Sequence, residues 1–170
     1  MTIEIRRLSP HDDRTAFRSG NVDLDRFFLR FAGQNQFRHH IGTTYVAVEG
    51  ARIIGYLTVA AAELEIAGLP ASRRKGLPAY PLPALRIARL AVDREHQGRG
   101  VGAELLKQAL LLARQTAEAV GCVGVLVDAK EDAVAFYARY GFEAATTVSG
   151  SLGDRPQPTA MFLPLALIPE

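Results

Sequence analysis

The feature that most constrains the fold is the stretch Asp93-Arg94-Glu95-His96-Gln97-Gly98-Arg99-Gly100-Val101-Gly102. It follows a β-rich run, Ala84 to Val92, and opens a helix expected from Val101 to about Val120. Glycines let a ligand approach the backbone closely, and the free N–H groups at a helix start attract anions. The order of strand, glycine loop and helix predicts an α/β domain that binds a phosphate group at the loop.

Two familiar phosphate motifs fit this loop poorly. A Walker-type loop needs Gly-Lys-Ser/Thr, which is missing from the sequence. A dinucleotide fingerprint matches formally as Gly98-x-Gly100-x-x-Ala103, but five residues separate it from the end of the strand. The acid expected about twenty residues further on would be Glu118, inside a helix and not at a strand tip. NAD binding is therefore disfavoured, and a glycine-rich turn without a ligand stays open as the plain alternative.

The other elements follow from periodicity and from turn residues. In chain order we expect a strand over 3–8, a helix from Asn21 or Asp23 to about His39 ended by Gly42, strands over 43–48 and 53–62, a proline-rich loop over 66–83, the strand over 84–92, the helix over 101–120 ended by Gly121, a strand over 123–127, a helix over 132–140, and a final antiparallel pair over 142–147 and 159–165. This order predicts one domain over residues 1–170, with a mixed central sheet flanked by helices.

Composition narrows the function classes. The single cysteine, Cys122, excludes an internal disulfide and a Cys-based zinc site, and no metal site is expected. No apolar run reaches the ~18 residues of a membrane span and no signal sequence follows Met1, so we expect a cytoplasmic protein away from membranes. The net charge of +2 hides an excess of +5 in residues 1–100, where Arg dominates. That excess could serve an anionic partner, although composition alone favours a solvated mixed surface.

Two motifs carry a family resemblance. Gln97-x-x-Gly100-x-Gly102, which follows the strand Leu90-Ala91-Val92, resembles the acyl-CoA-binding pattern of the GCN5-related N-acetyltransferases (GNAT). Phe136-Tyr137-x-x-Tyr140-Gly141-Phe142 resembles the terminal helix of that family. The resemblance implies a GNAT fold that uses acetyl-CoA, with the pyrophosphate on backbone N–H groups and the pantetheine amides on the strand edge. It places the cosubstrate on Leu90, Ala91, Val92, Gln97, Gly98, Arg99, Gly100, Val101, Gly102 and Phe136.

A narrower resemblance is carried by further segments. Phe17-x-Ser19-Gly20, Leu24-Asp25-x-Phe27, Ala88 to Asp93, and Val127-Asp128-Ala129-Lys130 are similar to the GNAT toxins of bacterial type II toxin–antitoxin modules. Those enzymes acetylate the amino group of aminoacyl-tRNA and so block translation. The resemblance implies this reaction, a ribbon-helix-helix antitoxin as partner, and a homodimer. The alternatives are a GNAT enzyme for a small-molecule or peptide amine, and a non-catalytic acyl-CoA-binding module.

The chemistry of acetyl transfer selects Tyr137. The leaving CoA thiolate needs a proton, and a phenol with an ordinary pKa near 10 carries one at neutral pH. The resemblance gives this general-acid role to Tyr137, and the alternative is an aromatic side chain packed in the core. Glu63 and Glu65 are candidate bases or simply exposed charges. An aminoacyl amine has a pKa no higher than the ~7.7–8.0 of a peptide α-amine, so it needs little help from a base.

Basic residues near the glycine loop suit an RNA substrate. Phosphate contacts are predicted for Arg73, Arg74, Lys75, Arg86 and Arg89, whereas Arg99 suits the phosphates of CoA. The alternative for the whole group is a surface that only keeps the protein soluble. His39 and His40 are adjacent, so they point to different sides of a helix and make a poor metal pair.

Overall fold

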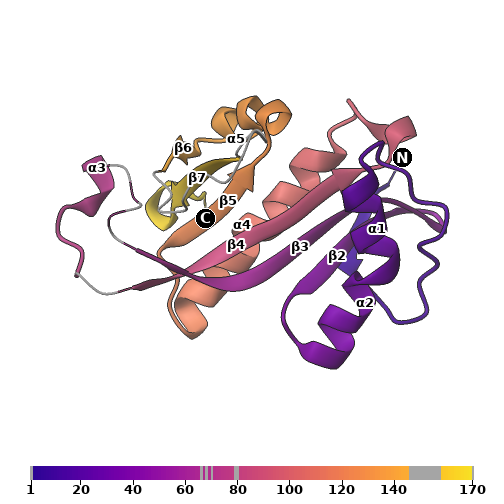
Figure 1. Ribbon diagram of the computed structural model, residues 1–170, viewed down its shortest axis with the longest axis horizontal. Coiled ribbons are helices and arrows are strands. Elements are labelled where there is room, and N and C mark those ends of the chain that lie inside the picture. Colours follow the sequence, from indigo (N-terminus) through magenta and orange to yellow (C-terminus); the bar gives the residue numbers. More distant parts are fainter. Residues whose placement is uncertain are drawn as a thin grey trace, which may run out of the picture. The chain divides into compact units, whose positions relative to one another are not determined.

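The computed structural model describes residues 2–65, 67, 69, 71–78, 81–145 and 158–169 (Figure 1). Its strands form a seven-stranded sheet in the order β1-β2-β3-β4-β5-β7-β6. The elements are β1 (Glu4–Arg7), α1 (Val22–Arg30), α2 (Ala32–Gln34), a π-helical turn (Asn35–His39), β2 (Thr43–Glu49), β3 (Arg52–Leu64), α3 (Ala71–Arg74), β4 (Leu82–Val92), a 3-10 turn (Arg94–His96), α4 (Val101–Ala119), β5 (Gly124–Ala129), a 3-10 turn (Glu131–Ala133), α5 (Val134–Arg139), β6 (Glu143–Ala144), β7 (Thr159–Pro164) and a 3-10 turn (Leu165–Leu167). The predicted mixed α/β sheet with flanking helices is confirmed.

The chain forms two compact units. The first comprises residues 1–60 and 87–111, and the second comprises residues 61–86 and 112–170. Strands β3 and β4 and helix α4 each contribute residues to both units. No helix of the described residues is long and apolar enough to cross a membrane.

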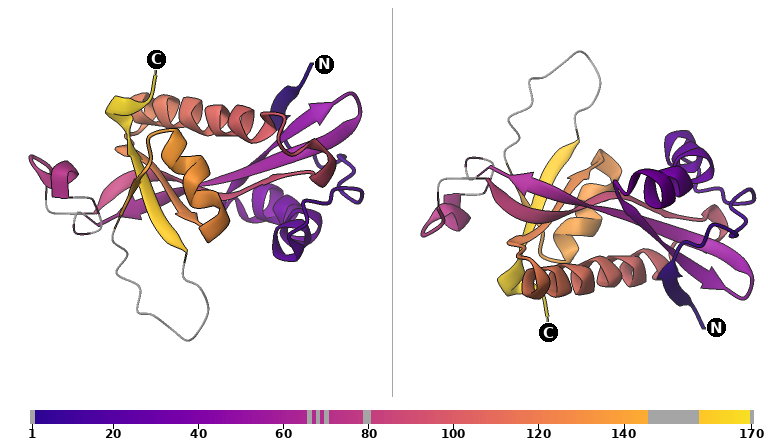
Figure 2. Two further views of the ribbon diagram at one scale, coloured as in Figure 1. Left: turned by 90° about the horizontal axis from the view of Figure 1, so that it is seen from above. Right: turned by 90° about the horizontal axis from the view of Figure 1, so that it is seen from below.

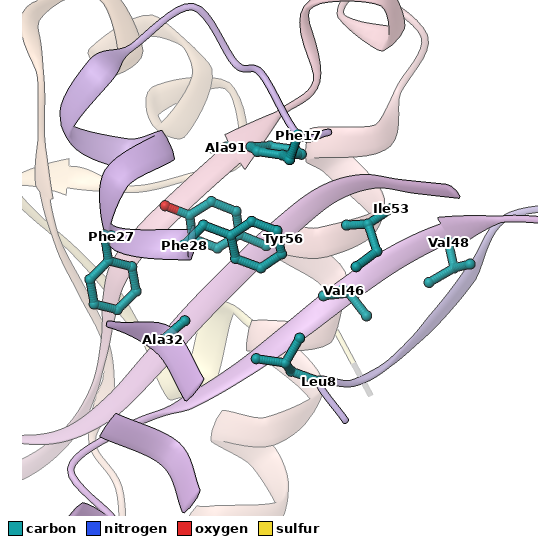
Figure 3. Close-up of a cluster of buried hydrophobic side chains, with 10 residues drawn as sticks. All are labelled: Leu8, Phe17, Phe27, Phe28, Ala32, Val46, Val48, Ile53, Tyr56 and Ala91. Carbon is teal, nitrogen blue, oxygen red and sulfur yellow. The ribbon is translucent and has the colours of Figure 1, made fainter. Parts of the chain in front are cut away.

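In the first unit, successive side chains of β3 point to opposite faces of the sheet. Tyr56 is fully buried, and its ring stacks on Phe28 of α1 with centroids 4.4 Å apart, while Phe17 meets it edge-on (Figure 3). Gly55 points to the other face, where a Cβ would lie 3.0 Å from side-chain carbons of Val101 and Leu105. The missing side chain thus lets α4 pack closely on the face opposite α1 (Figure 2).

The first helix differs from the prediction. Asn21 is its N-cap, since its side-chain oxygen accepts the N–H groups of Asp23 and Leu24. The helix ends at Arg30, however, and a short second helix and a π-helical turn follow it. His40, with a φ angle of 55°, terminates the segment, so Gly42 is not the residue that ends it. Hydrophobic spacing could not reveal the π-helical turn, because its buried residue is the polar Gln36.

The buried side chain of Gln36 has two hydrogen-bond partners. Its side-chain amide donates to the carbonyl oxygen of Leu8 at 3.2 Å and accepts the N–H of Thr44 at 2.8 Å. A polar side chain at 5% exposure needs such partners, and here they join the turn to the neighbouring strand β2.

The second unit contains the antiparallel partners β5 and β7. Gly124 of β5 faces Pro164 of β7, and β6 pairs with β7 over only two residues. The predicted helix over 132–140 is instead a 3-10 turn followed by α5, and Gly141 ends it with a φ angle of +94°. The predicted loop over 66–83 contains the short helix α3 and the start of β4. Thr146 and Thr147 of the predicted strand over 142–147 lie outside the described residues.

Helix α4 follows the prediction closely. It spans Val101–Ala119, and Gly121 follows it with a φ angle of +107°. The N–H groups of Val120 and Gly121 both donate to the carbonyl oxygen of Thr116 at 2.9 Å. The glycine therefore closes the helix in the manner expected of a left-handed C-terminal residue.

Candidate active site

The glycine loop joins β4 to α4 in the first unit. Gly98 and Gly100 have φ angles of +79° and +85°, in the left-handed region that favours glycine. A Cβ placed on either residue would meet no protein atom within 4 Å. The backbone conformation, and not packing, therefore requires glycine here, and the space in front of the loop is open to a ligand.

The start of α4 adds hydrogen-bond donors to the loop. The N–H of Glu104 donates to the carbonyl oxygen of Gly100 at 3.1 Å, which is the first hydrogen bond of the helix. The N–H groups of residues 101–103 precede that bond and have no partner inside the helix. They lie at the positive end of a 19-residue helix, and the exposed Arg99 belongs to the same loop. This set of donors fits a pyrophosphate.

Asp93 fixes the entrance to this loop. It is 2% exposed, and its carboxylate accepts the N–H groups of Glu95 and Arg18 at 3.1 and 3.3 Å. Burial by itself would raise the pKa of Asp93. The two N–H groups, with His96 and Arg52 beside the carboxylate, hold that pKa below its ordinary value. The site residues predicted from the sequence did not include Asp93, although an aspartate directly before a short helical turn is a capping signal.

The side chain of Gln97 forms hydrogen bonds with the backbone of the protein. Its amide group donates to the carbonyl oxygens of Ser19 and Val92 at 2.9 and 3.0 Å. The N–H of Arg94 also donates to the carbonyl oxygen of Arg18 at 2.7 Å. Gln97 can therefore offer a phosphate its backbone N–H, while its side chain ties the loop to the segment that enters α1.

The end of β4 is the strand predicted to meet pantetheine. Ala91 is buried among the side chains under α1, and Leu90 and Val92 are partly buried. The N–H of Asp93 donates to the carbonyl oxygen of Ile54, so β3 pairs with β4 up to the loop. These residues lead directly into the glycine loop, the order that the motif requires.

Tyr137 lies in the second unit, on α5. Its ring is 4% exposed and meets Phe136 and Phe142 with centroids 5.1 and 5.3 Å apart. Burial raises the pKa of its phenol well above the ordinary value, so the group stays protonated at neutral pH. Within the described part of the chain its hydroxyl has no hydrogen-bond partner. Phe136 is partly exposed, so the neighbour predicted to bind the cosubstrate is the more accessible of the two.

Most of the predicted RNA-contacting residues have protein partners. Arg73 pairs with Glu143 at 2.9 Å, and Arg86 pairs with Asp128 at 2.6 Å. Arg74 donates to the carbonyl oxygens of residues 67 and 69. The exposed Lys75 has no such partner in the described residues. Arg89, in the first unit, has its guanidinium carbon over the ring of Phe27.

The remaining residues singled out from the sequence are two glutamates and the cysteine. Glu63 and Glu65 are exposed. Cys122 is buried, and its thiol donates to the carbonyl oxygen of Gly124, as expected of a small core residue. The described residues contain no group of three His, Cys, Asp or Glu side chains that could hold a metal ion.

Comparison with known proteins defines the class. The profile of the acetyltransferase (GNAT) domain matches residues 40–144. A tRNA-acetylating toxin of Mycobacterium tuberculosis is 36% identical over 143 residues, which cover 84% of this chain and 85% of the toxin. The chain therefore belongs to the GNAT family, and it is an N-acetyltransferase that uses acetyl-CoA.

Further relatives are toxins. A probable toxin TacT of Sinorhizobium fredii is 28% identical over 92% of this chain and 87% of that protein. The structure of AtaT complexed with acetyl-methionyl-tRNAfMet matches with a TM-score of 0.85 and 28% identity, over 97% of this chain and 96% of AtaT. A tyrosine-to-phenylalanine mutant of KacT matches with a TM-score of 0.86 and 27% identity, over 99% and 98% of the two chains. Another similar structure is that of AtaTR bound with acetyl-CoA.

Proposed function

We propose that this protein acetylates the α-amino group of aminoacyl-tRNA and thereby acts as a translation-blocking toxin. The observation that carries the proposal is the 36% identity, over 84% of the chain, to a protein named as a tRNA-acetylating toxin. The structural similarity to AtaT in complex with acetyl-methionyl-tRNA supports the same acceptor. We propose that residues 1–170 act as one catalytic domain, since three elements run through both compact units. We also propose that the protein works in the cytoplasm.

The residues divide the work of acetyl transfer. Backbone N–H groups of Gln97, Gly98, Arg99, Gly100, Val101 and Gly102 hold the pyrophosphate of acetyl-CoA, while Leu90, Ala91, Val92 and Phe136 border its pantetheine arm. The acceptor nitrogen forms the new amide bond as the C–S bond breaks. Tyr137 donates its phenolic proton to the departing sulfur, and the proton lost by the amine leaves with solvent. The open space before Gly98 and Gly100 and the protonated phenol support these roles.

The acceptor needs little base catalysis. An aminoacyl α-amine has a pKa no higher than about 7.7–8.0, so much of it is neutral near pH 7.5. The exposed position of Glu63 and Glu65 agrees with a site that employs no carboxylate base. The proposed site is thus better matched to an α-amine than to a lysine side chain with a pKa near 10.4.

Partners follow from the relatives and from the surface. A structure of an AtaT tyrosine-to-phenylalanine mutant contains the C-terminus of the antitoxin AtaR, and we propose a ribbon-helix-helix antitoxin for this protein. We also propose a homodimer. The α1 region offers exposed apolar side chains for contacts of this kind, namely Val22, Leu29, Phe31, Phe37 and Ile41.

The decisive experiment supplies labelled acetyl-CoA with total charged tRNA. We expect label on the aminoacyl group, none on uncharged tRNA, and little on lysine or polyamines. Labelling of free amines with none on charged tRNA would overturn the toxin proposal while leaving the acetyltransferase class intact.

A further inference from the structure

Arg89 has an unusual setting in the first unit. It lies on β4 two residues before Ala91, so strand alternation places both on the face that packs under α1. There its guanidinium carbon lies 3.7 Å from the centroid of the Phe27 ring. Figure 3 shows Phe27 on α1 beside the stacked pair Phe28 and Tyr56. This contact places the guanidinium against the ring, where a cation is attracted to the aromatic face.

The charge of Arg89 has no anionic partner in the described residues. Arg6, Arg73 and Arg86 each pair with a carboxylate within 3 Å, whereas no carboxylate of the described residues forms an ion pair with Arg89. Its guanidinium also donates no hydrogen bond to the described part of the chain. Leaving the donors of a partly buried guanidinium unpaired costs free energy, and a hydrogen-bond acceptor on a bound ligand would remove that cost.

Neighbouring polar groups do not fill this role. The carboxylate of Asp25 already accepts the N–H and the hydroxyl of Ser19, at 3.0 and 2.6 Å. The hydroxyl of Tyr56 donates to the carbonyl oxygen of Leu24 at 2.7 Å. The Asp25 carboxylate and the Tyr56 hydroxyl therefore have partners other than Arg89, whose donors stay unused within the described residues.

The position along β4 relates Arg89 to the cosubstrate. A strand rises about 3.3 Å per residue, so Arg89 lies about 10 Å before Val92, where the strand enters the glycine loop. A cosubstrate with its pyrophosphate on the loop and its arm along β4 extends in this direction. This step depends on the proposed function, which places the arm on Leu90, Ala91 and Val92.

We propose that Arg89, placed over the Phe27 ring, recognises the carbonyl oxygen of the aminoacyl ester, the group one carbon away from the attacking amine. A guanidinium that donates to this oxygen fixes the position of the neighbouring nitrogen. An alkylamine without an adjacent carbonyl offers no acceptor, so it leaves the guanidinium unpaired and reacts less well. Arg89 is thus a specificity-determining residue for α-amino esters, and its partner is not a tRNA phosphate.

The test compares two variants with three assays. Arg89→Lys keeps the charge and loses the planar fork. Arg26→Lys is the control, because Arg26 lies on the exposed side of α1 and pairs with Asp23. Acetyl-transfer rates are measured with charged tRNA and with a simple alkylamine. Inhibition by uncharged tRNA and binding of acetyl-CoA by calorimetry complete the set.

Arg89→Lys should lower kcat/KM for charged tRNA by about 10- to 100-fold, because an ammonium group on a flexible stem does not keep the position and the donor geometry of the guanidinium over Phe27. The slow alkylamine reaction, acetyl-CoA affinity and inhibition by uncharged tRNA should stay within about twofold, and Arg26→Lys should match the wild type. Unchanged kcat/KM for charged tRNA overturns the proposal. An equal loss with the alkylamine also overturns it, because Arg89 would then act on the thioester or on the fold.

The phosphate alternative has its own outcome. Weaker inhibition by uncharged tRNA, in proportion to the loss with charged tRNA, would show that Arg89 binds the RNA backbone and would overturn the proposal. Failure of the proposed function is distinguishable, because the wild type itself would then leave charged tRNA unacetylated. In that case amino-acid methyl esters replace tRNA as acceptors, and equal rates of wild type and Arg89→Lys on them overturn the inference.

Discussion

Tyr137 combines a buried aromatic ring with a phenol that is hard to ionise. Its ring packs between Phe136 and Phe142, which fixes the direction of the hydroxyl. Burial raises the pKa, so the proton is retained throughout the neutral range. A proton donor to a departing thiolate needs these two properties, a set position and a proton that is present before the reaction.

Replacing Tyr137 by Phe should therefore remove the proton donor and leave folding and acetyl-CoA binding intact. The ring contacts remain, so the melting temperature and acetyl-CoA affinity should change little. The single-turnover rate with charged tRNA should fall by roughly 10²–10⁴-fold, with the apparent affinity for tRNA almost unchanged. Rapid-quench measurements check this prediction, and a full wild-type rate in Tyr137→Phe would contradict it.

The acceptor amine and the Tyr137 phenol together determine how the rate of the wild type depends on pH. The rate should rise with pH as the acceptor α-amine, with its pKa near or below 8, loses its proton. Because the pKa of Tyr137 lies above its ordinary value, the donor stays protonated and no decline should follow up to about pH 10. Single-turnover rates between pH 6 and pH 10 test this, and a decline centred near pH 9 would exclude Tyr137 as the donor.

Gly100 tests the anion site with a matched control. Gly100→Val puts a β-branched residue at a φ angle of +85°, where it strains the loop and fills the open space before the helix. Gly50, in the turn between β2 and β3, has a φ angle of +63° and equally open surroundings. Both variants should lose similar stability, but calorimetry should show weakened acetyl-CoA binding only in Gly100→Val. Equal binding by both would contradict the site.

At the scale of elements, the glycine loop and the start of α1 behave as one piece. Asp93 accepts the N–H of Arg18, Gln97 donates to the carbonyl oxygen of Ser19, and Asp25 of α1 holds Ser19. The first two bonds join residues that are 75 and 78 positions apart in the sequence. The third lies within the segment that enters α1. Acetyl-CoA bound on the loop should therefore steady the entrance to α1 as well.

Gln97→Ala cuts one of these ties and leaves the backbone donors in place. Amide exchange over residues 18–25 should accelerate, and acetyl-CoA should bind about 3- to 10-fold more weakly, since each neutral hydrogen bond contributes about 1 kcal/mol. Gln115→Ala, on an exposed part of α4, is the control. Exchange mass spectrometry provides the measurement, and unchanged protection of residues 18–25 would refute the coupling.

Periodicity and turn residues predicted the elements whose ends depend on local sequence. Helix α4 was predicted within one residue because Gly121 closes it, and Asn21 was one of two expected caps. The π-helical turn after α2 was missed because its buried residue is Gln36, which bonds to residues distant in sequence. The same limit applies to the site. The glycine motif predicted the loop, whereas the roles of Asp93 and of the Gln97 side chain require knowledge of the segment near Ser19.

Over the whole molecule, charge is distributed unevenly along the chain. Residues 1–100 carry a net charge of +5 and the remainder −3. An excess of this kind attracts RNA over long range, but only direct phosphate contacts release counterions and set the salt dependence. The number of positive residues therefore overstates the number of contacts, since several guanidiniums already bind protein oxygens.

The basic segment around α3 allows this distinction to be measured. Lys75 is exposed and has no partner in the described residues, so it is free to meet a phosphate, whereas Arg73 is paired with Glu143 at 2.9 Å. Lys75→Ala should flatten the plot of log affinity for tRNA against log salt by about one unit. Arg73→Ala should leave the slope nearly unchanged, because an ion pair within the protein releases no counterions from RNA. Filter binding between 50 and 300 mM salt separates the two effects. A full unit lost in Arg73→Ala would mean that Arg73 leaves Glu143 for a phosphate, and Glu143→Gln should then strengthen binding.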